Sequence, residues 1–472
     1  MGIYKIHINN TFKILSSYLM KPFLRDSGTL LSGSLIAQGI AFLAYLVLGR
    51  LFTPDDFGLY NIFYSYIEVL IILSTCKYEL AIVIADSDDQ AAALTRLTLR
   101  LNALFSSLLL LIALVLALFH VTPSSLPPQL DLLLQPMVFF CGTTRVYTFL
   151  FNRYKHYRQI ATSEVVTSLG GTLLKILFGL LNTSLQFLHT LGMPLGTILG
   201  KVAGNIYYRL KIEKLKLKIE HTPVFDHPSK EGTGATANSQ FSILNSQLKG
   251  GSQFSIFNSQ FSTYKNFPLY TMPKELVSSF SANLPFLWLS VHFDNALIGL
   301  FGLALTFTMR PVGILANAFE KVFYASYSEK VRHHQPLWRD TLRFTLALNA
   351  VVVPIVVVAF FFAEPLFTFL FGAKWVGTGY YVRCIIPWLV VLLNANSLAF
   401  VANIFSTQRI DFFFQIAQLL LRIAALWVGI SQGNFRLAIL LFCAVSTAVQ
   451  LLQWGWYLIQ IRRHDIKNIT PL

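Results

Sequence analysis

The stretch Lys211-Ile-Glu-Lys-Leu-Lys-Leu-Lys-Ile-Glu220 opens a polar segment, about Tyr208 to Leu276, that divides this chain into two long apolar blocks. Further along it, Asn238-Ser-Gln-Phe-Ser-Ile-Leu-Asn-Ser-Gln-Leu248 recurs as Ser252-Gln-Phe-Ser-Ile-Phe-Asn-Ser-Gln-Phe261. Repetition rich in Ser, Gln and Asn buries too little apolar surface to offset the conformational entropy of an ordered chain. The sequence therefore predicts a connector between two membrane-embedded halves.

The charge of this connector predicts the side of the membrane on which it lies. It carries nine Lys and Arg residues against five Asp and Glu residues. Positively charged segments between membrane spans are typically retained in the cytoplasm, although long loops obey this rule less closely than short ones. We therefore expect the connector to be cytoplasmic.

Composition also indicates a membrane protein. Hydrophobic residues make up 54% of the 472 residues, charged residues 12%, and the mean hydropathy is +0.58. Ordinary globular proteins contain about 25% charged residues. A net charge of +15 would suggest nucleic acid in a soluble protein, but here the cations lie in short segments between apolar runs. We expect a polytopic membrane protein with no nucleic-acid partner. The four cysteines have no metal-ligand or disulfide spacing, so no metal site is predicted.

Apolar segments near the length of about twenty residues that crosses a bilayer recur along both blocks. They predict an all-α, polytopic fold with about twelve transmembrane helices. The first block contains segments 29–49, 58–83, 99–120, 130–151, 160–181 and 185–207, and the second contains 277–293, 297–320, 341–363, 379–403, 410–430 and 434–461.

Loops rich in cations and loops poor in cations alternate along the chain, as expected for loops on alternate sides of the membrane. The loops assigned to the inside carry Lys5, Lys13, Lys21, Arg25, Arg96, Arg153, Lys155, Arg158, the connector, Lys321, Lys330, Arg332, Arg339, Arg409, Arg462, Arg463 and Lys467. The expected domains are a cytoplasmic N-terminal segment 1–28, a six-helix lobe 29–207, a linker 208–276 with a low-complexity insertion at 232–262, a second lobe 277–461 and a cytoplasmic tail 462–472. We expect a multi-pass protein of the cytoplasmic (inner) membrane with both termini inside.

Charged residues near the ends of the first spans are candidates for gating. Thr53-Pro54 is expected to break the first helix, with Asp55-Asp56 near the N-terminus of the next. Lys77 and Glu79 come near the end of the second predicted span, close to the cytoplasmic surface, where such charges are more often snorkelling anchors than a site. We take Arg50, Lys77 and Glu79 as candidates for a role at the membrane surface or in gating.

Several motifs resemble one known family. They are Gly49-Arg-Leu-Phe-Thr-Pro-Asp-Asp-Phe-Gly-Leu-Tyr60, Lys77-Tyr-Glu-Leu-Ala-Ile82, Asp86-Ser-Asp-Asp-Gln-Ala-Ala92, Tyr264-Lys-Asn-Phe-Pro-Leu-Tyr270, Asn283-Leu-Pro-Phe286, Arg310-Pro311, Val322-Phe-Tyr324 and Phe371-Gly-Ala-Lys-Trp375. In order and spacing they look like the oligosaccharide and polysaccharide flippases of the polysaccharide transport family, within the superfamily of multidrug, oligosaccharidyl-lipid and polysaccharide exporters. The insertion at 232–262 departs from that pattern.

This resemblance implies a fold and a function. The fold would be two six-helix lobes around a central cavity that opens alternately to either side, a common plan for transporters. The substrate would be an undecaprenyl-pyrophosphate-linked oligosaccharide, moved for surface polysaccharide such as the O-antigen of lipopolysaccharide. An ion gradient would supply the energy, because the chain has no Gly-x-x-x-x-Gly-Lys-Ser/Thr loop. Neither enzymatic activity nor a cofactor is expected. Membrane lipids, a polysaccharide polymerase and a chain-length regulator are the candidate partners.

Two other classes of protein remain as alternatives. A multidrug-type small-molecule exporter of the same superfamily would share the twelve-span plan. A membrane enzyme such as a polysaccharide polymerase would also be polytopic and basic, but we would expect a large outer loop with clustered Arg or His.

Charges predicted near mid-membrane are the candidate substrate-binding residues. Lys175, Arg310 and Arg422 are cations at that depth, and Glu68 is the main acid. Each cation costs about 2.5–3.5 kcal/mol at a helix centre, so such residues usually face a cavity or a partner. An anionic substrate would balance this excess. Arg310 is the leading candidate because it precedes Pro311. The alternatives are that Arg310 pairs with Glu68 and that Lys175 and Arg422 hold helices together.

Overall fold

The computed structural model describes residues 28–119, 125–181, 188–215, 264–332, 335–405 and 407–469. All regular structure in these ranges is helical, so the all-α prediction is confirmed for them. The N-terminal half contains α3 (Gly28–Leu51), α4 (Pro54–Thr75), α5 (Glu79–Ile84), α6 (Asp88–Leu118), α7 (Pro128–Arg153), α8 (Tyr157–Leu181) and α9 (Leu188–Leu215). The C-terminal half contains a π-helical turn η1 (Phe267–Thr271), α12 (Met272–Leu289), α13 (Asn295–Arg332), α14 (Trp338–Phe371), the short η2 (Ala373–Trp375), α15 (Thr378–Ser397), α16 (Val401–Ile404), α17 (Gln408–Ser431) and α18 (Phe435–Ile469).

Each predicted span overlaps one long helix, with differences at the ends and at two breaks. The predicted span 58–83 is interrupted after Thr75, and α5 continues it after a short turn. The predicted span 379–403 is likewise divided between α15 and α16. Helix α9 continues to Leu215 and α12 begins at Met272, so helix extends into both ends of the predicted linker. The repeat at 232–262 lies outside the described residues.

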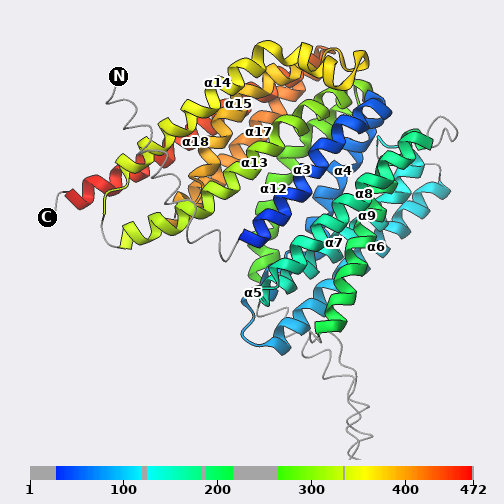
Figure 1. Cartoon of the computed structure of the whole chain (residues 1–472), viewed down its shortest axis with the longest axis horizontal. Coiled ribbons are helices and arrows are strands. Elements are labelled where there is room, and N and C mark those ends of the chain that lie inside the picture. Colours follow the sequence, from blue (N-terminus) through cyan, green and yellow to red (C-terminus); the bar gives the residue numbers. More distant parts are fainter. Residues whose placement is uncertain are drawn as a thin grey trace, which may run out of the picture.

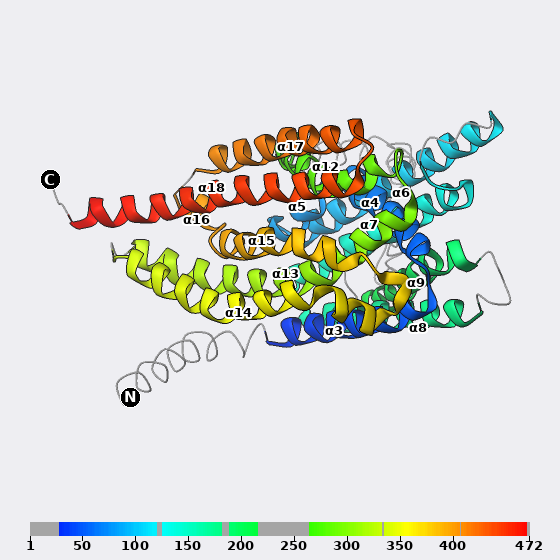
Figure 2. The same ribbon diagram turned by 90° about the horizontal axis from the view of Figure 1, so that it is seen from above.

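The helices run side by side in an elongated bundle (Figure 1). Helices α14, α15, α17 and α18 lie along one side and α6 to α9 along the other, with α3, α4, α12 and α13 between them (Figure 1). The central helices pack across the two halves of the chain, since α4 contacts both α12 and α13. Helix α3 lies between α8 and α14, as the perpendicular view also shows (Figure 2).

Eight helices in the described ranges are long and apolar enough to cross a membrane by length and composition. Helices α6 and α14 carry much of their apolar surface on the outside, including Leu110, Leu118, Phe361 and Phe369. Apolar side chains outside and polar side chains inside are what a bilayer favours, because lipid cannot satisfy polar groups. Helices α7, α9 and α12 are less apolar than these eight helices. All three supply polar residues to a cavity in the bundle. The number of spans and their division into two lobes stay predictions.

The turn between α3 and α4 shows why the chain breaks at Thr53-Pro54. The Thr53 side chain accepts a hydrogen bond from the Asp56 backbone N–H at 3.3 Å, and the Asp56 carboxylate accepts one from the Thr53 N–H at 2.8 Å. This reciprocal capping box satisfies two N–H groups at the start of α4, and proline at the first helical position needs no donor of its own.

At this same end of the bundle the two halves of the chain are joined closely. A Cβ added to Gly299 in α13 would lie 1.8 Å from the Pro54 carbonyl oxygen, and one added to Gly58 in α4 would lie 2.0 Å from the Asn295 carbonyl oxygen. Only glycine lets the backbones of α4 and α13 approach this closely. The end of the bundle that contains these residues is therefore tightly packed, and we call it the packed end.

Candidate functional site

A cavity of about 860 Å³ lies toward the other end of the bundle, where the described chain leaves α9 and returns at α12. Its walls are formed by α4, α7, α8 and α9 of the N-terminal half and by α12 of the C-terminal half. The lining is dominated by hydroxyl and charged side chains: Tyr64, Glu68, Thr144, Arg145, Thr148, Ser163, Glu164, Thr167, Ser168, Lys201, Tyr208, Glu275, Ser278 and Ser279. A polar cavity between membrane-type helices is the expected form of a transport site.

Close packing at glycine residues brings α8 and α9 together, and these two helices form one wall of the cavity. A Cβ on Gly200 would lie 2.7 Å from both the Gly171 Cα and the Thr167 carbonyl oxygen. Two helices without side chains at the contact approach backbone to backbone, and their larger side chains turn to either side. This packing directs Thr167 and Ser168 of α8 and Lys201 of α9 to the same cavity.

Four charged residues meet beside the cavity at the break between α4 and α5. Lys77 forms an ion pair with Glu275 of α12, and its Nζ lies 3.9 Å from Oε1 of Glu79. The Nε atom of Arg145 lies 3.1 Å from the same Glu79 oxygen. Lys77 and Glu79 are 1% and 0% exposed, so the prediction that they anchor the helix by reaching the membrane surface is wrong. Burial between α4, α7 and α12 makes them part of an internal ionic cluster.

The backbone holds Lys77 in this position by an unusual turn. Cys76 and Lys77 have φ angles of 47° and 62°, in the left-handed region that non-glycine residues seldom adopt. Cys76 ends α4, and α5 starts again at Glu79. This turn directs the Lys77 side chain into the bundle. In an unbroken helix the same side chain would point in another direction.

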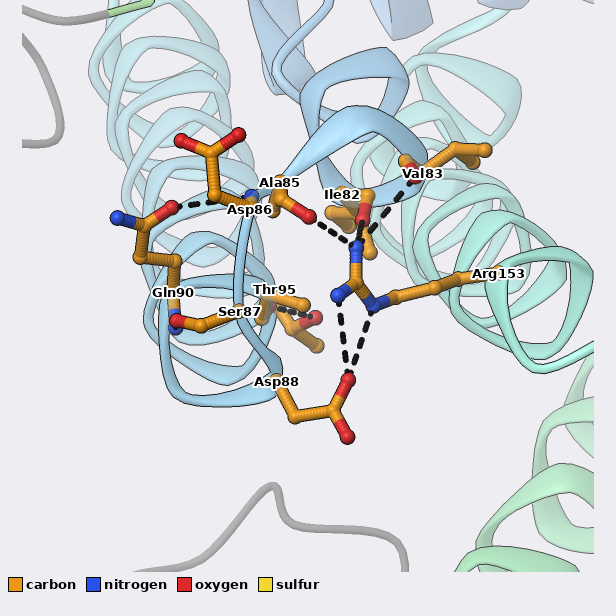
Figure 3. Close-up of polar contacts among 10 residues, drawn as sticks. Ile82, Val83, Ala85, Asp86, Ser87, Asp88, Gln90, Thr95 and Arg153 are labelled. Atoms are coloured by element: carbon orange, nitrogen blue, oxygen red, sulfur yellow. Dashed lines mark hydrogen bonds and ion pairs between the residues drawn. The ribbon is translucent and has the colours of Figure 1, made fainter.

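Arg153, at the end of α7, holds α5 on the bundle (Figure 3). Its Nη1 donates to the carbonyl oxygens of Ile82 at 3.2 Å and Ala85 at 2.6 Å, and its Nη2 lies 3.1 Å from the Asp88 carboxylate. A guanidinium group at a helix C-terminus satisfies carbonyls that have no helical partner. Asp88, in the acidic segment that begins at Asp86, thus helps Arg153 to hold α5, the helix that begins at Glu79.

Lys175, Lys201 and Arg310 form a second group of charges, which we call the cationic cluster. Lys201 lines the cavity, whereas Lys175 and Arg310 lie beyond the lining, toward the packed end. Lys175 Nζ donates to the Tyr60 hydroxyl at 3.2 Å, and Arg310 Nη2 donates to the Tyr45 hydroxyl at 3.2 Å. Within the described residues, none of these three cations has a carboxylate at ion-pair distance.

Glu68, the acid predicted near mid-membrane, does line the cavity. Its Oε2 accepts a 2.8 Å hydrogen bond from Nδ2 of Asn283 in α12. In this conformation Arg310 interacts with Tyr45 rather than forming the predicted alternative pair with Glu68, although the two charges are near enough to influence each other. Both tyrosine rings near the cluster also hold a cation over their faces: Arg310 Cζ is 4.9 Å from the Tyr45 centroid and Lys175 Nζ is 4.9 Å from that of Tyr60.

The remaining two candidates lie away from the cavity. Arg422 is buried in the C-terminal half, where it donates to Ser281 and Ser446 and lies over Phe442. The alternative role given for it by the sequence, holding helices together, describes these contacts. Arg50 lies at the packed end, where its Nε donates to the Leu370 carbonyl at 2.9 Å.

Arg145, Glu164, Lys201 and Glu275 line the cavity but were not selected from the sequence. Arg145, Glu164 and Lys201 are charged residues within predicted spans, which is the sequence signal that Lys175 also carries. Glu275 was counted with the linker and carried no such signal. Its position became clear only from the start of α12 at Met272.

Comparison with solved structures identifies the fold. The chain is similar to an inward-facing multidrug resistance MATE family transporter of the MOP superfamily, with a TM-score of 0.59 at 12% identity over 92% of this chain and 99% of that one. It is similar to the lipid II flippase MurJ in an inward closed conformation, with a TM-score of 0.64 at 11% identity over 93% and 90%. It is also similar to a MOP superfamily transporter from Pyrococcus furiosus, with a TM-score of 0.58 at 13% identity over 95% of this chain and 98% of that one. The chain therefore has the fold of these multi-pass membrane transporters.

Comparison at the level of sequence shows similarity to two family models with one description. No curated protein matches the chain. Two family models, both described as polysaccharide biosynthesis protein, match residues 23–250 and 239–380 and together extend over both halves. The resemblance seen in the sequence motifs is thereby confirmed: both halves of the chain match families described as polysaccharide biosynthesis protein, and the chain has the fold of the MOP superfamily transporters.

Proposed function

We propose that this protein is a flippase that moves lipid-linked oligosaccharide, on an undecaprenyl-pyrophosphate carrier, across the cytoplasmic membrane for the synthesis of surface polysaccharide such as O-antigen. One observation carries the proposal. The cationic cluster of Lys175, Lys201 and Arg310 adjoins a polar cavity, and within the described residues it has no carboxylate partner. Cations in a membrane without a carboxylate at ion-pair distance are costly, so an anionic ligand is the natural counter-charge.

The two chemical parts of such a substrate match two parts of the site. Phosphate oxygens are strong acceptors for lysine ammonium and arginine guanidinium groups, which the cationic cluster supplies. Sugar hydroxyls both donate and accept hydrogen bonds, as do the cavity hydroxyls of Thr144, Thr167, Ser278 and Ser279. The lipid tail would remain in the bilayer against the apolar outer surface.

The location and partners belong to the same proposal. We place the linker, both termini and the open end of the cavity on the cytoplasmic side, where such oligosaccharides are assembled. A polysaccharide polymerase and a chain-length regulator would receive the oligosaccharide on the other side. The driving force would be an ion gradient.

The decisive experiment is a transport assay with the purified protein in lipid vesicles. A fluorescent undecaprenyl-pyrophosphate oligosaccharide is incorporated, and a membrane-impermeant quencher is added outside. Vesicles with protein should lose fluorescence from the inner leaflet as well, whereas protein-free vesicles should keep it. Equal protection in both, with the protein shown to be folded, would contradict the proposal. Lengthening of the oligosaccharide would instead favour a polymerase, and uptake of organic cations alone would favour an exporter.

A further inference from the structure

Helix α12 has two neighbouring faces with different tasks. Glu275, Ser278, Ser279 and Ala282 line the cavity, and their spacing places them on one side of the helix. Ser281, on another side, contacts Arg422 of α17, while Lys274 Nζ lies 3.9 Å from the Asp411 carboxylate. The same helix is therefore a wall of the cavity and a bridge between the two halves of the chain.

Pro285 interrupts the hydrogen-bond ladder of α12 at a defined place. Proline has no N–H, so the carbonyl of Ser281, four residues earlier, loses its helical donor. Arg422 replaces that donor: its Nη1 lies 3.1 Å from the Ser281 carbonyl oxygen and 3.0 Å from its hydroxyl. The Nε of Arg422 donates to Ser446 of α18 at 2.9 Å, so the proline break is held by the C-terminal half. Membrane helices tolerate proline where a neighbour satisfies the freed carbonyl in this way.

The first turn of α12 is held by the N-terminal half instead. Glu275 pairs with Lys77, which is 1% exposed and fixed by the left-handed turn at Cys76–Lys77. A second carboxylate, Glu79, lies 3.9 Å from the Lys77 ammonium and is itself close to Arg145. Within the described residues, Oε2 of Glu79 accepts no hydrogen bond. When Lys77 releases Glu275, it therefore keeps Glu79 as a counter-charge. A buried charge left without a partner is the usual obstacle to opening such an ion pair.

We propose that α12 is the gate of the cavity. Its hinge is the Pro285 break, with Arg422 as a positioning residue, and its latch is the ion pair between Lys77 and Glu275. Movement of the segment before Pro285 displaces the wall that carries Glu275, Ser278 and Ser279, and so changes access to the cavity. This inference goes beyond the proposed function because it holds whatever the cavity binds.

The hinge is tested by the rate at which a water-soluble maleimide alkylates S279C, in purified protein whose native cysteines have been replaced. R422Q alone should raise the rate about fivefold or more, because the hinge loses its support. In a P285A background the alanine N–H supplies the bond to Ser281, so R422Q should have little effect. Equal effects of R422Q in both backgrounds would overturn the hinge. If R422Q does not fold, R422M, which fills much of the same space without any donor, takes its place and the same comparison applies.

The latch is tested by cross-linking and by removing one charge. Oxidation of K77C/E275C should slow alkylation of S279C about tenfold, and a reducing agent should restore it. E275Q should speed alkylation, whereas E213Q, which removes the exposed acid paired with Arg209 at 3.8 Å, should not. A cross-linked protein with an unchanged rate would overturn the latch. None of these measurements needs a substrate, so their failure and that of the proposed function are distinguishable.

Discussion

The indole Nε1 of Trp375 donates a 2.8 Å hydrogen bond to the carbonyl oxygen of Gly49, which joins η2 to the end of α3 from the opposite half of the chain. Lys374 reinforces this contact by donating to the Arg50 carbonyl at 2.9 Å and the Phe52 carbonyl at 2.6 Å. Trp375 is fully buried, and its ring meets Phe57 edge to face at 5.0 Å. The packed end is therefore held by directional bonds as well as by apolar contact.

Removing that bond should weaken the packed end. Trp375→Phe keeps an aromatic ring but leaves the Gly49 carbonyl without its donor, and we expect about 1–3 kcal/mol of lost stability. The melting temperature in detergent should fall. Trp427→Phe is the matched control, because Trp427 is 60% exposed, and it should change the melting temperature little. An equal loss in both variants would mean that the hydrogen bond contributes nothing specific.

Glycine packing predicts opposite effects at two positions of the same helix. Gly299→Ala would place a Cβ 1.8 Å from the backbone oxygen of Pro54, so α4 and α13 must separate. We expect loss of stability and of transport. Gly313→Ala meets nothing within 4 Å and should be neutral or stabilising by up to about 1 kcal/mol, the helix propensity of alanine over glycine. Thermal unfolding of both variants measures the difference, and a well-folded Gly299→Ala protein would contradict the packing.

Arg310 tests the cationic cluster. Arg310→Ala should abolish surface polysaccharide in a strain that lacks its own flippase, at an unchanged protein level, and Arg310→Lys should keep part of it. Arg436→Ala is the control: Arg436 lies over the Tyr380 ring at 5.4 Å, as Arg310 lies over Tyr45, but outside the cationic cluster. If Arg310→Ala complements as well as the unchanged protein does, Arg310 does not bind the substrate.

Single cysteines in a background without native cysteines test the orientation. Cysteines at Ser124 and Val376 should react with an impermeant thiol reagent on intact cells, and one at Gln240 should not. Val376 is preferable to the neighbouring Gly377, whose φ of 97° would strain any other residue, and Val376 is 59% exposed. Labelling of Gln240→Cys on intact cells would reverse the predicted topology.

The inserted repeat should be dispensable. Deleting residues 234–262 removes a polar segment whose composition supports no packed core, and joining two halves needs only sufficient reach. We expect normal expression and transport. Loss of transport at a normal protein level would show that the repeat has a role beyond connection.

The sequence by itself determined the all-α membrane fold and the similarity to polysaccharide biosynthesis proteins. Long apolar segments and polar connectors specify helices in a bilayer without any tertiary information, because a span must satisfy its backbone bonds internally. The Thr53-Pro54-Asp-Asp56 cap was readable for the same reason, since its partners are only three residues apart. Intramembrane cations such as Lys175 and Arg310 were also visible as charges that require an explanation.

Only the tertiary structure decided what those charges do. Arg310 and Arg422 looked alike along the chain, yet Arg310 lies beside the cavity and Arg422 satisfies the carbonyl that Pro285 frees in a helix 141 residues away. Lys77 looked like a surface anchor until the left-handed turn at Cys76 placed it inside, against Glu275. Hydropathy reports how deep a residue lies in the membrane, but which side of its helix meets which neighbour depends on packing between distant segments, and no local pattern encodes it.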